Sequence, residues 1–216
     1  MNREEIISAM NTNVKYMYPL VESIRIENRQ LHHVELHNQR INKARQAVYG
    51  LTDRIAVEEI IKLPSDLSSE RYKCRITFYP DHTEYTILPY HQREINTLKV
   101  VYDDTIDYTY KNENRQQLDA AYNQRGNCDD VIIVKNGYIT DSWAANILFY
   151  DGKKWITPNT PLLKGTQREY LLQGGLIEER SVMIDDLYSY QKIRLINAMI
   201  DFERSSEITI KTSVFF

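Results

Sequence analysis

The side chain in this sequence with the most capacity for chemistry is Lys111. It lies in the stretch Tyr110–Arg115, where alternating segments give way to a helical pattern that starts near Asn114. A lysine amine attacks carbonyl carbons and moves protons when burial and a nearby cation lower its pKa. Lys111 is therefore a candidate nucleophile and base, and the other chemically capable residues must indicate what it acts on.

Two features could bind an anion. Arg40 lies on a predicted helix, and its guanidinium fork matches phosphate oxygens, although a solvated helix arginine is the commoner alternative at such a position. Gly165-Thr166 stands just before another predicted helix, where free N–H groups, a hydroxyl and the helix dipole favour an anion. The same dipeptide is also a common helix cap without any ligand, so both interpretations remain open.

Asp141 is the acidic candidate. It ends a predicted strand and is followed by Ser-Trp-Ala-Ala-Asn, a run in which small residues would let a ligand approach the backbone. His37, three residues before Arg40 on the same helix face, is better suited to orient a loop by hydrogen bonding than to act as a base. The histidines form no metal pattern, and Cys74 and Cys128 lie far apart, so no metal site is expected.

The elements that must position these residues fall into two halves. The first, residues 1 to about 105, is predicted as an antiparallel sheet carrying one or two helices, an α+β unit. Its helix from residue 34 has Gly50 as C-cap. The expected elements are strands at Leu20–Ile26 and Leu31, helices from Val34 and over Ile55–Leu63, a hairpin of Tyr72–Tyr79 with Glu84–Leu88, and a strand at Ile95–Tyr102.

The second half, residues about 106 to 216, carries two hairpin signals. Asn136-Gly137 and Asp151-Gly152 each separate two apolar runs and favour two-residue turns with positive φ. After the second hairpin comes the helix that follows Gly165, which Gly174-Gly175 ends. The remaining expected elements are a strand at Ser181–Ile184, a short helix at Asp185–Tyr190 and a last core strand at Lys192–Ile200.

Bulk properties exclude several classes of protein. The chain has 216 residues and a net charge of −3, with no basic stripe that could follow nucleic acid, while an anionic small molecule remains a possible partner. No apolar run approaches the roughly 20 residues of a membrane helix. The start, Met1–Glu5, lacks the order of a signal peptide, and cysteines are scarce. A cytoplasmic protein that binds neither nucleic acid nor membrane is expected.

Taken in order, the motifs resemble those of the class IV aminotransferases, which are pyridoxal-phosphate (PLP) enzymes of fold type IV. Within that group they are most similar to 4-amino-4-deoxychorismate lyase. The likeness runs from about Leu20 to Ile200, and it is the order and spacing of the motifs that make it specific. The matching segments are Val21-Glu22-Ser23, His37-Asn38-Gln39-Arg40-Ile41, Lys111-Asn112-Glu113-Asn114-Arg115, Thr140–Phe149, Thr157-Pro158, Leu163–Arg168 and Asn197-Ala198-Met199.

The resemblance implies a role for each candidate. Lys111 would form the Schiff base with the cofactor aldehyde and then move protons, and Asp141 would pair with the pyridine nitrogen. The phosphate would be held by Arg40, by the backbone around Gly165, Thr166 and Gln167, and by Asn197-Ala198. Ser23 falls where the lyase has a threonine that touches substrate or assists protonation.

The resemblance also implies an architecture. An α+β, two-domain fold like that of D-amino acid aminotransferase is expected, with a smaller α/β-sandwich at residues 1–105 and a larger cofactor-binding sheet or pseudo-barrel domain at 106–216. A homodimer acting on a small amino acid-like substrate follows. The sequence departs from the family in having Asp141 for the usual Glu, Asn28-Arg29 for a glycine-containing turn, and short stretches before Leu20 and between Arg40 and Lys111.

Four functions are compatible with these residues. The lyase would eliminate pyruvate to give 4-aminobenzoate, a step of folate biosynthesis, and Lys-x-x-Asn-Arg favours it. A D-amino acid or branched-chain transaminase would share the cofactor and the first proton transfer. The short loops and Asp141 motivate a third possibility, a PLP-binding homologue without turnover. A cofactor-free α+β binding module would leave the ordered motifs unexplained.

Overall fold

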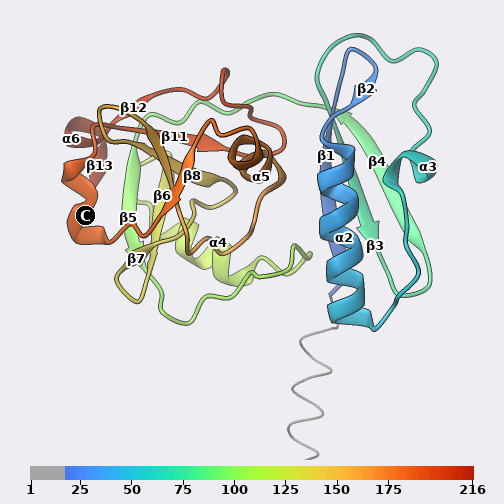
Figure 1. Ribbon diagram of the computed structural model, residues 1–216, viewed down its shortest axis with the longest axis horizontal. Helices are drawn as coiled ribbons and strands as arrows, with labels where there is room; N and C mark the ends of the chain where they lie inside the picture. Colours follow the sequence, from blue (N-terminus) through green and yellow to red (C-terminus); the bar gives the residue numbers. More distant parts are fainter. Residues whose placement is uncertain (1–17) are drawn as a thin grey trace, which may run out of the picture.

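The computed structural model describes residues 18–216, so the expectations for the first residues of the chain and for the segment ahead of Leu20 lie largely outside it. The first half is a four-stranded sheet in the order β2-β1-β3-β4, with helix α2 packed on one face (Figure 1). Its elements are β1 (Leu20–Glu27), β2 (Gln30–Leu31), α2 (Val34–Tyr49), α3 (Val57–Ile60), β3 (Tyr72–Phe78) and β4 (Thr83–Pro89).

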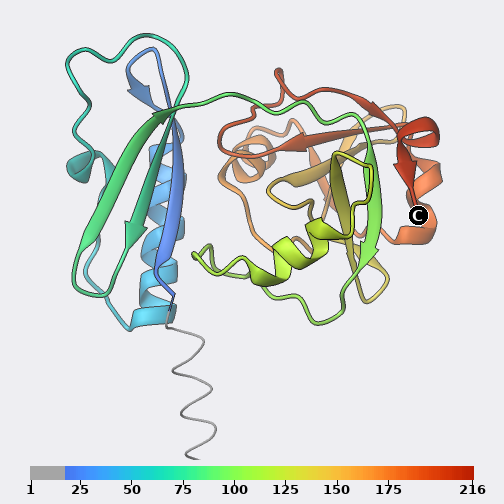
Figure 2. The same ribbon diagram turned by 180° about the vertical axis from the view of Figure 1, so that it is seen from behind.

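Alternation along β1 sends its side chains to two different neighbours. Leu20, Ile24 and Ile26 are buried in the core against Ile41 and Ala44 of α2. Since successive strand residues point to opposite faces, Val21, Ser23 and Arg25 point away from that helix. Figure 2 shows the second half of the chain beside β1, and Arg25 pairs with Asp201 of that half. The strand therefore forms the core of one half and a wall facing the other.

Helix α2 confirms the expected helix, and Gly50 ends it with φ 70° and its N–H bonded to carbonyls of the last turn. Helix α3 is a correction, because it covers only Val57–Ile60 rather than Ile55–Leu63. The Asn28-Arg29 turn has φ values of 51° and 59°, so this pair adopts the left-handed conformation that glycine usually supplies.

The second half contains two sheets, β10-β9-β8-β11-β12 and β13-β5-β6-β7. The first buries Phe149 and Ile193, the second buries Val100 and Ile132, and all four share one core. The elements are β5 (Leu98–Tyr102), α4 (Gln116–Asn123), β6 (Asp130–Lys135), β7 (Tyr138–Ile139), β8 (Asn146–Tyr150), β9 (Trp155–Pro158), α5 (Thr166–Gln173), β10 (Glu178–Arg180), 3₁₀ helix η1 (Ile184–Ser189), β11 (Lys192–Ile196), β12 (Ile208–Thr209), α6 (Ile210–Ser213) and β13 (Val214–Phe215).

The pairing of β5 moves the expected boundary between the halves. A division after residue 105 leaves Leu98–Tyr102 with the first half, but β5 pairs in parallel with β6 and with β13. Sheet membership therefore changes between Pro89 and Leu98. No apolar periodicity in β5 distinguishes the two possibilities, because a buried strand has the same pattern in either sheet.

The two predicted hairpins differ from each other. At Asn136-Gly137 both residues have positive φ, 51° and 80°, and Lys135 pairs directly with Tyr138, as expected. At Asp151-Gly152 the paired residues are Tyr150 and Trp155, so the loop has four residues instead of two. The side chain of Asp151 accepts the N–H groups of Lys153 and Lys154 at 2.9 and 2.8 Å, which stabilises the wider loop.

The last third of the chain holds the other corrections. The strand expected at Ser181–Ile184 lies earlier, at β10, where Glu178 pairs in parallel with Ile156. The last core strand ends at Ile196 instead of Ile200, because Asn197 turns the chain by accepting the N–H groups of Met199 and Ile200. It is not the last strand either, since β12 and β13 follow it.

The two halves meet along β1. The N–H of Val21 donates to the carbonyl of Lys111 at 2.9 Å, and Leu20 forms an isolated bridge with Asn112. Helix α2 also lies beside α5. The segment carrying Lys111 is thus fixed against the strand that carries Ser23. Within residues 18–216 no helix is both long and apolar enough to span a bilayer.

Candidate active site

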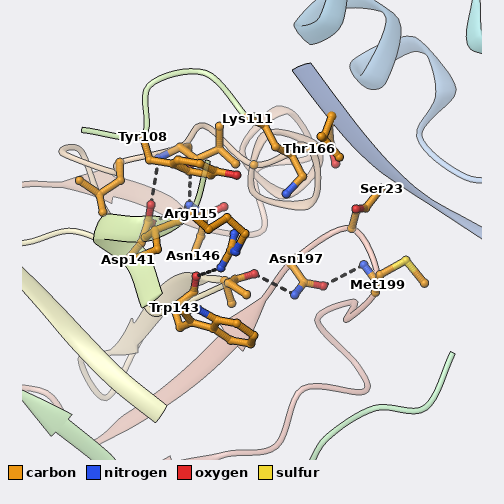
Figure 3. A pocket seen from close by; sticks show the side chains of 18 of the residues that line it. Ser23, Tyr108, Lys111, Arg115, Asp141, Trp143, Asn146, Thr166, Asn197 and Met199 are labelled. Carbon is orange, nitrogen blue, oxygen red and sulfur yellow. Dashed lines mark hydrogen bonds between the residues drawn. The ribbon is translucent and has the colours of Figure 1, made fainter. Parts of the chain in front are cut away.

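A cavity of about 330 Å³ lies between the two halves. Its walls come from β1 and β3, from the stretch around Lys111, from the end of β7 onward, from the start of α5 and from the turn after β11. Figure 3 shows side chains from these separate segments converging on one space. Of the predicted site residues, those that line the cavity are Ser23, Arg40, Lys111, Asp141, Gly165, Thr166, Asn197 and Ala198.

Lys111 faces this cavity. Within residues 18–216, its Nζ makes no hydrogen bond and no ion pair. Burial among protein atoms lowers the pKa of Lys111 to about 7, and the charge of Arg40 adds to that effect. A substantial fraction of the amine is therefore unprotonated near neutral pH, which is the form that attacks a carbonyl or accepts a proton.

Asp141 lies deeper, with 5 % of its surface exposed. Its Oδ1 accepts a hydrogen bond from Asn146 Nδ2 at 2.8 Å, and its Oδ2 accepts the N–H of Leu163 at 2.9 Å. Burial nevertheless raises its pKa to about 7, because the two hydrogen bonds offset only part of the desolvation. A carboxyl group with a pKa near 7 can share a proton with a second titrating group, such as a ring nitrogen.

Asn146 is a residue whose role the sequence did not reveal. Its Nδ2 donates both to Asp141 and to the carbonyl of Leu163, each at 2.8 Å (Figure 3). Its Oδ1 lies so close to Gly165 that a Cβ at that position would approach it to 2.1 Å. Asn146 thus joins the buried acid to the chain that leads into α5, and Gly165 is required for this close approach.

Glu22 is a second residue that sequence reasoning did not single out. This carboxylate, 1 % exposed, accepts hydrogen bonds from Arg40 Nε at 2.8 Å and Nη2 at 2.5 Å, and contacts His37 Nδ1 at 2.7 Å. Burial alone would raise the pKa of Glu22, but the charge of Arg40 and the hydrogen bonds outweigh it and lower that pKa to about 2. Burial lowers the pKa of His37, which favours the neutral form of its ring.

This cluster aims Arg40 at the start of α5. Arg40 Nη1 points toward the carbonyl of Lys164 at 3.3 Å, and His37 Nε2 lies 3.5 Å from Thr166 Oγ1. The N-cap residue of α5 is Gly165, and within the described residues no side-chain cap bonds to the first N–H groups of this helix. An arginine and an uncapped helix N-terminus on the same side of a cavity form an anion site.

Gln167 and Asn197 differ from the simplest expectation. The side chain of Gln167 does not line the cavity, since its Oε1 faces His33 Nε2 at 3.0 Å. Only its backbone could reach an anion at the helix start. The Asn197 amide donates to the carbonyl of Ala144 at 3.0 Å and its oxygen holds the turn, so this side chain shapes the wall.

Two buried polar atoms at the cavity are left without a partner inside the described chain, Ser142 Oγ and Asn112 Oδ1. Buried polar atoms are nearly always satisfied in native proteins, so these two atoms are available to water or to a polar ligand in the cavity. An amine of lowered pKa, a buried carboxyl group across from it and a phosphate-type anion site are the donor set that PLP requires. The residues present fit this cofactor.

Comparisons with known proteins agree with this donor set. Residues 19–208 match the family model described as amino-transferase class IV. An uncharacterized protein of Haemophilus influenzae is 38% identical over 188 residues, which cover 85% of this chain and 98% of that protein. The crystal structure of a candidate 4-amino-4-deoxychorismate lyase from Haemophilus somnus 129pt is 34% identical, covers 85% of this chain and 97% of that one, and superposes with a TM-score of 0.78.

More distant structures share the fold. A candidate amino-acid aminotransferase from Mesorhizobium loti has a TM-score of 0.74 at 19% identity, with 89% of this chain and 98% of that one covered. A hypothetical aminotransferase from Mycobacterium tuberculosis in its PLP-bound form has a TM-score of 0.71 at 15% identity, with coverages of 91% and 82%.

The fold and the site define a fold type IV enzyme, as the sequence resemblance predicted. The chain belongs to the class IV aminotransferase family, and it is accordingly a PLP-dependent enzyme. Lys111 would carry the covalent link to the cofactor, and Asp141 would face its ring nitrogen. Arg40 and the backbone at Gly165-Thr166 would hold its phosphate.

Proposed function

We propose that the enzyme is a 4-amino-4-deoxychorismate lyase, which eliminates pyruvate from its substrate and leaves 4-aminobenzoate. The observation that carries the proposal is the presence of two proton-handling groups in one cavity, Lys111 Nζ and Ser23 Oγ (Figure 3). Amino transfer needs one group that moves a proton between two carbon atoms. Elimination also needs a donor for the departing enolpyruvate, and the hydroxyl of Ser23, which lines the same cavity, would supply it.

The chain's own residues divide the work as follows. Lys111, unprotonated near pH 7, takes the proton from the substrate carbon that bears the amine. When bound, PLP supplies an electron sink for the electron pair left on that carbon. Ser23 donates a hydrogen bond to the enolpyruvate oxygen as its C–O bond breaks and passes on the proton that Lys111 has taken, so both side chains return to their starting protonation states. Asp141 provides the negative charge, or the shared proton, at the ring nitrogen.

The Lys111–Arg115 motif and the 34% identity to the Haemophilus somnus protein support the lyase over a transaminase.

We also propose a homodimer in the cytoplasm. Size-exclusion chromatography with light scattering measures the oligomeric state directly, and a monomer that retains full turnover would overturn the dimer.

The test is to load the purified enzyme with PLP and supply aminodeoxychorismate. Release of equal amounts of pyruvate and 4-aminobenzoate, lost in Lys111→Ala and reduced in Ser23→Ala, is the expected result. Incubation with D-alanine and 2-oxoglutarate provides the opposing assay. Rapid amino transfer without pyruvate release from aminodeoxychorismate would replace the lyase by a transaminase. Borohydride reduction followed by peptide mapping should place the label on Lys111.

A further inference from the structure

The first turn of α5 is held in place by side chains from several segments. Its residues Thr166, Gln167 and Arg168 are 3%, 2% and 1% exposed, so none of the three is free in solvent. A helix of eight residues is too short to be stable by itself, and this one has no side-chain cap among the described residues. The conformation of the turn therefore depends on the contacts that its side chains make with the rest of the protein.

The direction of this turn matters for anion binding, because the first N–H groups of a helix have no acceptor within it. In α5 the N–H of Glu169 is the first to bond back, to the carbonyl of Gly165 at 3.0 Å. The N–H groups of Thr166, Gln167 and Arg168 are thus left free of intrahelical bonds, and such groups hold an anion at a helix start. A rotation of the turn would point them away from the cavity.

Helix α2 contacts this turn across the boundary between the halves (Figure 1). His33, His37 and Arg40 recur four and three residues apart, so they share one face of the helix. His37 Nε2 lies 3.5 Å from Thr166 Oγ1, and His33 Nε2 lies 3.0 Å from Gln167 Oε1. The face of α2 that carries Arg40 therefore contacts two successive residues of the anion-binding turn.

His33 makes the closer of these two contacts. Its imidazole ring also packs against Tyr170, with ring centres 4.3 Å apart. Gln167 and Tyr170 are three residues apart and lie on one face of α5, so His33 is held between them. The backbone of His33 has φ 55°, an uncommon conformation for a residue other than glycine, and such a conformation is retained where surrounding contacts determine it.

The imidazole of His33 does not contact the cavity, since this residue is absent from the cavity lining. Burial, aided by the charge of Arg25, lowers the pKa of His33 to about 4, so the ring is neutral near pH 7. The contact with Gln167 Oε1 is then a neutral hydrogen bond that the ring N–H donates. Any effect of His33 on an anion in the cavity must therefore pass through α5.

We propose that His33 is a positioning residue for the cofactor phosphate: by holding Gln167 and Tyr170, it sets the direction in which the first turn of α5 presents its N–H groups to the cavity. The first half of the chain thus contributes to the phosphate site in two ways, directly through Arg40 and indirectly through His33. This inference concerns the cofactor and not the substrate, so the outcome of the pyruvate-release assay does not affect it.

The experiment compares PLP with pyridoxal, which has the same ring and aldehyde but no phosphate. His33→Asn is the test variant, because asparagine tolerates positive φ and is common before a helix, so α2 should be retained. The variant should weaken PLP binding about tenfold, the size of one hydrogen bond, and change the affinity for pyridoxal by less than about twofold. Equilibrium dialysis with protein freed of cofactor measures both affinities.

A double-mutant cycle identifies the path of the effect. If His33 acts through the side chain of Gln167, then Gln167→Ala should also weaken PLP binding, and the two losses should not add in the double variant. His82→Asn is the matched control. The ring of His82 also lies 4.3 Å from a tyrosine ring, that of Tyr79, but it is 50% exposed in the turn between β3 and β4 and outside the cavity lining. This control should leave both affinities unchanged.

Three results would overturn the positioning role. The first is an equal loss for PLP and pyridoxal in His33→Asn, and the second is no loss for PLP. The third is a double variant in which the losses add, because His33 would then act independently of Gln167. Urea unfolding of the same variants separates binding from folding: a lower free energy of unfolding with both affinities kept would assign His33 to packing alone.

Discussion

Strand β1 carries a buried ionic cluster on each of its faces, and the two clusters balance their charges differently. On the helix face, Glu22 holds Arg40 and contacts His37, while Lys111 stands nearby with no ion-pair partner among residues 18–216. On the opposite face, Arg25 and Arg71 meet Glu27 and Asp201, and Arg71 Nη1 also donates to the carbonyl of Met199 at 2.6 Å. We refer to them as the cavity cluster and the latch cluster.

In the latch cluster each charged group has a partner of opposite charge without a ligand. Each buried arginine has both carboxylates within reach, and Arg204 adds an exposed contact to Glu27. The cavity cluster, together with Lys111, has an excess of cations that only an anionic ligand can offset. Removing one partner from a fully paired buried cluster costs stability, whereas a buried charge left unpaired already costs stability in the intact protein and is typical of binding sites. Removal of the unpaired amine of Lys111 should therefore stabilise the protein, whereas removal of a paired carboxylate from either cluster should destabilise it.

The largest effect is expected from Lys111→Met in protein freed of cofactor. The pKa of Lys111 falls from 10.5 to about 7 on folding, so the folded state binds this proton less tightly than the unfolded state does. The resulting penalty is fully present below pH 7, shrinks as pH rises and is gone above 10.5. Removing the amine should raise the free energy of unfolding by on the order of 4 kcal/mol at pH 6.

Urea unfolding at pH 6 and pH 10 measures this difference. Lys192→Met, which removes an exposed lysine paired with Glu207, is the control and should change little at either pH. A destabilised Lys111→Met at pH 6 would mean that its amine is paired in solution, and would remove the contrast between the clusters.

Glu22→Gln should act in the opposite direction. The pKa of Glu22 falls from 4.5 to about 2 on folding, so its contribution is present above pH 4.5 and is lost as pH falls toward 2. The variant should lose on the order of 3 kcal/mol at pH 7 and show a flatter acid limb between pH 4.5 and 2. It should also release PLP more readily, because Arg40 loses the carboxylate that aims it.

Acid titration followed by circular dichroism, and dialysis followed by cofactor absorbance, provide the two measurements. An unchanged acid limb would show that Glu22 is not the group that titrates there. If the variant is less stable but retains the cofactor, then Glu22 is not needed to orient Arg40 for phosphate binding.

Asp201→Asn tests the latch cluster. The carboxylate of Asp201 accepts hydrogen bonds from both Arg25 and Arg71, and these contacts keep its pKa below the usual range in spite of burial. The variant should lose about 2 kcal/mol near neutral pH, with the loss disappearing as pH falls below 3.8. The affinity for PLP should stay within about twofold of wild type, measured by equilibrium dialysis.

The elements that position the site could be predicted where local signals are strong. The helix from Val34 to Gly50 and the Asn136-Gly137 hairpin carry their own caps and turn residues, and both are found. The wider Asp151 loop could not be predicted, because it depends on which side chain bonds which N–H. The strands near the C-terminus could not be predicted either, since two-residue strands have no periodicity and β13 pairs with distant β5.

The residues of the candidate site could also be predicted only in part. Lys111, Arg40 and Asp141 were singled out from sequence order, and the structure brings all three to one cavity. Glu22 was quoted only as part of a motif, because a carboxylate in an apolar strand gives no local indication of its partners on α2. Asn146 was likewise quoted only as part of a motif, because its contacts with Leu163 and Gly165 join segments about 20 residues apart.

Gly165→Ala tests Asn146 and has the smallest expected effect on stability. The added Cβ would lie 2.1 Å from Asn146 Oδ1, so the amide or the backbone must shift, at a cost of about 1–2 kcal/mol. Since φ at Gly165 is −72°, alanine tolerates the backbone conformation there, and the effect comes from the contact alone.

The sharper readout is Asp141. A displaced Asn146 removes the hydrogen bond to Oδ1, which now partly offsets the effect of burial, so the pKa of Asp141 should rise above its value of about 7. Carbonyl-region infrared difference spectra as a function of pH follow this protonation in protein freed of cofactor. Gly174→Ala is the control, because a Cβ there meets its nearest neighbour, the Tyr170 carbonyl, at 3.4 Å. An unchanged titration of Asp141 in Gly165→Ala would contradict this role of Asn146. Asn146 would then only pack the end of the strand, and Asp141 would not be coupled to the start of α5.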